Sequence, residues 1–70
     1  MTAAQIVLNG EKRPLAASTL SGLLREAGIA TGKRGIAVAV NEAVVPRRDW
    51  PQTALHPGDR VEVVKLFSGG

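Results

Sequence analysis

The apolar residues of this chain fall into short runs that are separated by turn-forming residues, a pattern typical of strands packed around one helix. The first run is Gln5-Ile6-Val7-Leu8, and Asn9-Gly10 follows it. Because a type I′ turn needs positive φ at both central residues, this dipeptide predicts a hairpin with a return strand over residues 11–15. Pro14 cannot donate a ladder hydrogen bond, so we expect this return strand at a sheet edge.

A single main helix is predicted over residues 20–27. Apolar residues recur there at positions i, i+3, i+4 and i+7, which form one face of a helix: Leu20, Leu23, Leu24 and Ala27. Ser18-Thr19 supplies an N-cap before the helix, and Gly28 is placed for a left-handed C-cap after it. An apolar stripe on one helix needs a sheet to cover.

The second half of the chain predicts three more strands. Ile36-Ala37-Val38-Ala39-Val40 carries its branched residues on one face, and Asn41-Glu42 turns the chain into a short strand that ends at Pro46 and suits an edge. Trp50 follows in an irregular or single-turn segment and is interpreted as a lid on the end of a small core. His56-Pro57-Gly58-Asp59 is a turn that leads into the last strand.

The order strand, strand, helix, strand, short strand, strand predicts an α+β roll, with a mixed sheet of four to five strands and one main helix. We expect residues 1–67 to form a single domain and Ser68-Gly69-Gly70 to form a flexible tail. One helix covers only one face of such a sheet. The other face is therefore expected to expose Val64 and Leu66 beside the tail. We interpret these two residues, together with Phe67, as a patch that docks a partner protein. The alternative is a bulge after Val63 that shifts the register and leaves little exposed.

Composition narrows the function further. The 70 residues contain no Cys and a single His, which leaves no disulfide, no thiolate metal site and no visible nucleophile–base pair, so we expect neither an enzyme nor a metal protein. No apolar run approaches a membrane span, and we expect a soluble cytoplasmic protein. Nine Lys and Arg against six Asp and Glu give a net charge of +3, but the basic pairs are scattered and aromatic residues are few. Solvated loops explain them better than a nucleic-acid surface.

The remaining candidate for chemistry is the carboxylate of Gly70. A carboxylate becomes reactive when another enzyme converts it to an acyl-adenylate, from which a sulfur or nitrogen nucleophile displaces AMP. Glycine has no Cβ to block a narrow channel, so Gly69 and Ser68 are interpreted as the segment that gives Gly70 access to a partner's nucleotide site. Extended, these three residues reach roughly 10 Å beyond the strand.

These features together resemble one family. The run from Val38 to Arg47 with Trp50, the turn and strand from Leu55 to Val64, and the final Gly69-Gly70 are similar to the ThiS family, sulfur carriers of thiamin thiazole synthesis with the β-grasp (ubiquitin-like) fold. The resemblance covers essentially the whole chain. At Glu42-Ala43 the family often has a glycine, which leaves the turn type open.

The resemblance implies a cycle of partners. A ThiF-type adenylyltransferase uses MgATP to adenylate Gly70, a persulfide donor supplies sulfur for a thiocarboxylate, and thiazole synthase (ThiG) takes the sulfur into the ring. The chain itself is expected to bind no cofactor. Related alternatives with the same tail are the MoaD-type small subunit of molybdopterin synthase and a ubiquitin-like protein modifier. A small basic nucleic-acid-binding domain is a third class, which leaves Gly69-Gly70 unexplained.

Overall fold

The computed structural model describes residues 4–29 and 35–65. The elements follow one another as β1 (Gln5–Leu8), β2 (Glu11–Pro14), α1 (Leu20–Glu26), β3 (Ile36–Val40), β4 (Ala43–Val45), the 3-10 helix η1 (Arg47–Gln52) and β5 (Arg60–Lys65). No helix within these ranges has the length and apolarity that a membrane span requires.

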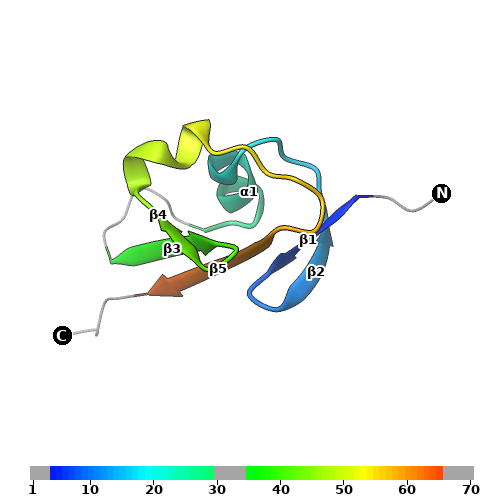
Figure 1. The fold of residues 1–70 in the computed structure, drawn as a ribbon, viewed down its shortest axis with the longest axis horizontal. Helices are drawn as coiled ribbons and strands as arrows, with labels where there is room; N and C mark the ends of the chain where they lie inside the picture. The colour runs from blue at the N-terminus through cyan, green and yellow to red at the C-terminus, as the bar shows by residue number, and fades with distance from the viewer. Residues whose placement is uncertain (1–3, 30–34, 66–70) are drawn as a thin grey trace.

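The strands form one mixed sheet in the order β2-β1-β5-β3-β4 (Figure 1). β1 and β2 form one antiparallel hairpin, and β3 and β4 form another. β5 joins them, parallel to β1 and antiparallel to β3. The two edges are therefore β2, which contains Pro14, and β4, which Pro46 follows. This confirms the edge positions that both prolines predict.

Both hairpins turn through two residues with positive φ. Asn9 and Gly10 have φ of 51° and 85°, which confirms the predicted turn. Asn41 and Glu42 have φ of 52° and 72°, so the second turn has the same form without a glycine. A left-handed conformation costs a residue with a Cβ about 1–2 kcal/mol. The hydrogen bonds that hold Asn41, described below, stabilise this turn against that cost.

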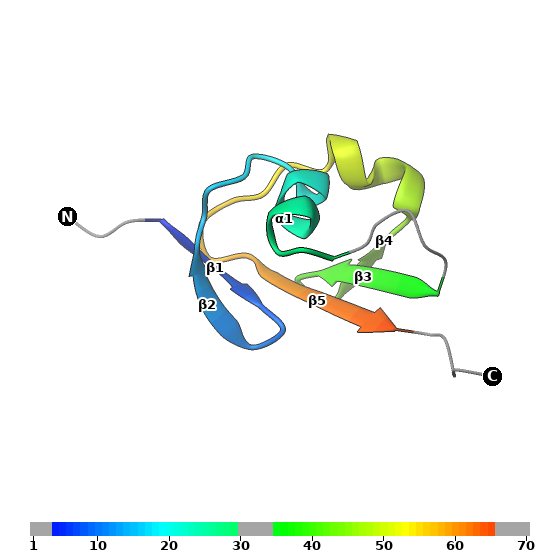
Figure 2. The same cartoon turned by 180° about the vertical axis from the view of Figure 1, so that it is seen from behind.

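α1 begins at Leu20, as the sequence predicts, and ends at Glu26, one residue before the predicted end, with Ala27 as its C-cap. The Thr19 hydroxyl accepts a hydrogen bond from the backbone N–H of Gly22 (3.2 Å), and Gly28 follows the helix with φ of 79°. Figures 1 and 2 show α1 and η1 on the same side of the sheet. Between them and the sheet lies the buried core: Ile6, Leu8, Leu20, Leu23, Leu24, Val38, Trp50, Leu55 and Val61. The opposite face, here called the open face, is left uncovered by every element in the described ranges.

Trp50 closes one end of this core, as predicted. Its side chain is 3% exposed, and its indole N–H donates to the backbone oxygen of Val45 (2.8 Å). The Arg47 guanidinium lies over the ring, 4.8 Å from its centre. The segment is longer than the single turn expected from sequence, because η1 continues through Pro51 to Gln52. The N–H of Asp49 donates to the oxygen of Pro46 (2.8 Å) at its start.

Candidate functional site

β5 is the strand that leads to the candidate site. Of the predicted site residues, Val64 lies in this strand and is described. Leu66, Phe67, Ser68, Gly69 and Gly70 lie outside the described residues, so their assigned roles stay predictions. The structure therefore tests only β5, the strand that precedes the predicted tail, and the residues that hold this strand in place.

The register of β5 is regular as far as Lys65. Its residues pair one by one with β3, from Val61 opposite Val40 to Lys65 opposite Ile36. The alternative of a bulge after Val63 is therefore wrong within β5. Alternation places the fully buried Val61 on the helix side and Val64, which is 53% exposed, on the open face. The prediction that an aliphatic side chain is exposed just before the tail is confirmed for Val64.

A second exposed aliphatic side chain lies on the same face. Val44 of β4 is 73% exposed, and it is paired with Ala39, which is paired with Glu62. In the next row, Ala37 is paired with Val64. The apolar part of the open face thus runs across three strands, with small alanines in the middle. Toward the beginning of β5, charged residues replace the apolar ones on this face.

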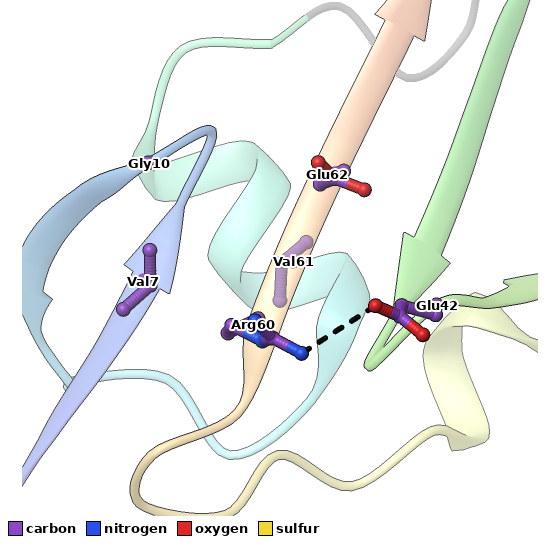
Figure 3. Close-up of a pocket in the computed structure, with 6 residues that line it drawn as sticks. All are labelled: Val7, Gly10, Glu42, Arg60, Val61 and Glu62. Carbon is purple, nitrogen blue, oxygen red and sulfur yellow. Dashed lines mark ion pairs between the residues drawn. The ribbon is translucent and has the colours of Figure 1, made fainter.

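Charged residues line a hollow of about 220 Å³ between the two hairpin turns (Figure 3). Its lining consists of Val7, Gly10, Glu42, Arg60, Val61 and Glu62. The Arg60 guanidinium lies 3.7 Å from the Glu42 carboxylate, and these side chains are 64% and 81% exposed. Such an exposed ion pair contributes little to stability. The lining includes neither a Ser or Cys nucleophile nor a His base.

Two asparagine side chains hold β5 from opposite sides. Asn41 Oδ1 accepts from the backbone N–H of Arg60 (3.0 Å), and Asn9 Oδ1 accepts from the backbone N–H of Val63 (2.8 Å). Asn9 and Val63 are separated by 54 positions in sequence. The sequence predicts both asparagines as turn residues, but no local signal indicates that each also binds the central strand. These contacts fix the direction in which β5 points toward the tail.

Asp59 connects this arrangement to the preceding turn. Its carboxylate accepts from Asn41 Nδ2 (3.0 Å) and from the backbone N–H of His56 (2.8 Å). These two hydrogen bonds hold the pKa of the Asp59 carboxyl below its ordinary value. Its backbone oxygen accepts from the N–H of Val7 (2.9 Å), where β1 begins to pair with β5. The His56 side chain is 73% exposed with its Nδ1 3.7 Å from the carboxylate, in agreement with a turn residue.

We expect Asp59→Asn to destabilise the fold at pH 7 by about 1–3 kcal/mol, because an amide cannot accept both hydrogen bonds as a carboxylate does. Because the pKa of Asp59 is lowered in the folded state, its carboxylate contributes to the free energy of unfolding. This contribution is fully present above the pKa of Asp59 in the unfolded chain and is lost as the pH falls through the pKa in the folded state. Urea unfolding of the wild type should therefore lose stability below about pH 4, and the variant should lose less over that range.

Asp49→Asn is the matched control, because that carboxylate is 46% exposed and lies 3.9 Å from the exposed Arg48 side chain. It should change stability little at either pH. Equal acid sensitivity of the wild type and Asp59→Asn would contradict the role given to Asp59.

Comparison with known proteins connects this geometry to a family. The ThiS family matches residues 6–70 of the chain. The sulfur carrier protein ThiS of Thermus thermophilus is 44% identical over 63 residues, which are 90% of this chain and 95% of that protein. A thiazole synthase of Paramagnetospirillum magneticum is 39% identical over 67 residues, 94% of this chain, but the chain spans only 20% of its length.

A solved structure agrees with the fold. The crystal structure of the thiamine biosynthesis protein ThiS from Geobacter metallireducens superimposes with a TM-score of 0.78, at 23% identity, over 94% of this chain and 99% of that one. This likeness confirms the β-grasp fold, with a five-stranded mixed sheet and one main helix. The family match through residue 70 and the near-complete coverage of the Thermus relative establish that the chain belongs to the ThiS family of sulfur carrier proteins.

Proposed function

We propose that this chain carries sulfur for thiamin thiazole formation as a thiocarboxylate on Gly70. The observation that supports this most is the ThiS family match, which includes Ser68, Gly69 and Gly70. The structure adds a suitable starting point for the tail, because β5 is the central strand, paired with β1 at Arg60 and Val61 and with β3 from Val61 to Lys65. A rigid strand followed by two glycines combines a fixed starting point with a narrow end.

The proposed chemistry has three steps, all on partner enzymes. A carboxylate oxygen of Gly70 attacks the α-phosphorus of MgATP, and pyrophosphate leaves. The terminal sulfur of a persulfide donor then attacks the acyl carbon, and AMP leaves. The product is an acyl disulfide between Gly70 and the donor. A thiol then attacks the donor's sulfur and forms a disulfide with it, and the thiocarboxylate on Gly70 is released. Gly69 and Ser68 give Gly70 access to the site where these bonds change.

In this proposal the chain is a co-substrate and not an enzyme. MgATP is bound by a ThiF-type adenylyltransferase, and the thiocarboxylate is consumed by thiazole synthase (ThiG) in the cytoplasm. The match between this chain and part of a protein named thiazole synthase supports that second partner. A MoaD-type role and a ubiquitin-like modifier use the same terminal chemistry, but the family match and the Thermus relative favour the thiamin pathway.

Intact-protein mass spectrometry tests the proposal. The full chain is incubated with MgATP, a ThiF-type enzyme from the same cell and a persulfide donor. We expect the mass to rise by the difference between one sulfur and one oxygen, with the change located at Gly70. Omission of ATP is the control and should leave the mass unchanged. An unchanged mass with an enzyme that demonstrably adenylates another ThiS protein would contradict the proposal, as would covalent conjugates to lysines in place of a thiocarboxylate.

We further propose that Val64, together with Leu66 and Phe67, contacts the adenylyltransferase. Val64 supports this because it is an exposed aliphatic side chain in the strand that leads to the tail. Val64→Glu should lower the kcat/KM for adenylation at least tenfold, since it places a charge in a contact of this kind. Val44→Glu is the matched control on the same face, two strands away. Equal losses in both variants would contradict a docking site centred on Val64.

A further inference from the structure

The edge of β5 that faces β1 is only partly paired. β1 pairs with β5 at two positions, Val7 with Arg60 and Leu8 with Val61, and then turns away at Asn9. β5 continues to Lys65. On its other side β5 stays paired with β3 along this whole length. The last residues of the central strand thus have a neighbour on one side only, among the strands that the structure describes.

The hydrogen bonds show which backbone groups face this edge. Val61 accepts from the N–H of Asn9 (2.9 Å), and Val63 donates to the Asn9 side chain (2.8 Å). Because the backbone groups of a strand alternate between its two neighbours, the oxygen of Val63 and the N–H of Lys65 face the same way. Within the described ranges neither group has a hydrogen-bond partner. Asn9 fills the first position beyond β1, and the edge is open after it.

We propose that the open edge at Val63 and Lys65 receives an extended segment of the adenylyltransferase, which adds a strand to the sheet in line with β1. This inference rests on the proposed function and names the contact through which that enzyme would hold the carrier. The added strand donates one backbone hydrogen bond to Val63 and accepts one from Lys65. This mode of recognition is the addition of a strand to an exposed sheet edge.

The side chains at this edge indicate what the segment carries. Directly paired residues point to the same face of a sheet. A residue of the added strand opposite Val64 would therefore lie on the open face, where an apolar side chain would pack against Val64. A residue opposite the exposed Lys65 would lie on the other face, where an acidic side chain complements the ammonium group. A second copy of this chain fits less well, because antiparallel pairing of two such edges brings both Lys65 side chains to one face.

Lys65→Pro tests the edge without touching the existing sheet. Proline removes the N–H that points away from β3, and an outward-facing N–H is where a strand tolerates proline. We expect the kcat/KM for adenylation of the full chain by the ThiF-type enzyme to fall about tenfold or more. Lys65→Ala is the matched comparison, because it removes the ammonium group but keeps the N–H. It should lose less activity than Lys65→Pro, and the difference between the two variants measures the backbone hydrogen bond. Adenylation of Lys65→Pro at the wild-type rate would overturn the inference.

Amide hydrogen exchange of the wild type gives a second readout that needs no variant. The Lys65 amide should exchange faster in the free carrier than in the presence of excess adenylyltransferase and MgATP. Unchanged exchange at Lys65, in a sample where Gly70 is adenylated, would overturn the added strand while leaving the proposed function intact. Protection that instead rises with the concentration of the free carrier would assign the edge to a second copy and would also overturn the inference. If Lys65→Pro melts at a lower temperature, the exchange result decides.

Discussion

Deletion of Gly70 should abolish thiocarboxylate formation and leave the melting temperature of the carrier unchanged. The remaining carboxylate, on Gly69, would end about 3.5 Å short of its position in the full chain, too far for attack on a bound nucleotide. Among the described residues the buried core consists of side chains between Ile6 and Val61, so we expect its packing to persist. Intact mass after reaction with MgATP, the ThiF-type enzyme and a persulfide donor measures the chemistry, and circular dichroism measures the melt.

Gly70→Ala is the control for this deletion, because it keeps the chain length and the carboxylate but adds a Cβ. Gly70→Ala should react more slowly than the wild type but should form more thiocarboxylate than the deletion variant. A melt that collapses with the deletion would show that the tail is part of the folded domain, and the separation of platform and reactive end would be wrong.

Trp50→Ala is expected to destabilise the protein by about 3–5 kcal/mol, the usual cost of removing a buried aromatic side chain. Domains of this length bury a smaller share of their surface than larger ones, and total stabilities are about 5–15 kcal/mol. The change therefore removes much of the available stability. The side chain is 3% exposed and fills the end of the core beneath η1. Urea unfolding followed by far-ultraviolet circular dichroism measures the effect, since the variant has no tryptophan fluorescence.

Trp50→Phe separates packing from hydrogen bonding. It keeps an aromatic ring but removes the donor to the oxygen of Val45, and should cost about 1–3 kcal/mol. A loss below about 1 kcal/mol in Trp50→Ala would contradict the role of this residue as the lid of the core.

Local sequence chemistry predicts most elements of this fold. Asn9-Gly10, the Thr19 cap and Gly28 each determine a turn or a helix end through contacts within a few residues, and all three are found as expected. Pro14 and Pro46 identify the edge strands for an equally local reason, the missing N–H. The exposure of Val64 follows from alternation once one face is assigned to the helix.

Contacts between distant residues could not be predicted in this way. The bond from Val63 to Asn9 joins positions 54 apart, and nothing near either residue requires it. The regular register of β5 could not be chosen over a bulge from its apolar pattern alone. Pairing with β3 determines it. The left-handed Glu42 also depends on distant partners, since Asn41 in the same turn is held by Asp59 and Arg60.

The central position of β5 has a consequence for the order of folding. The β1–β2 and β3–β4 hairpins make no sheet contact with each other except through this strand, which comes after both in the chain. During synthesis on the ribosome, the two halves of the sheet therefore stay separate until residues 60–65 have emerged. The pairing of Val7 with Arg60 closes a long loop, which is a slow step compared with forming a hairpin. The sheet is thus completed only when residues 66–70 are about to follow, the segment to which we assign the sulfur.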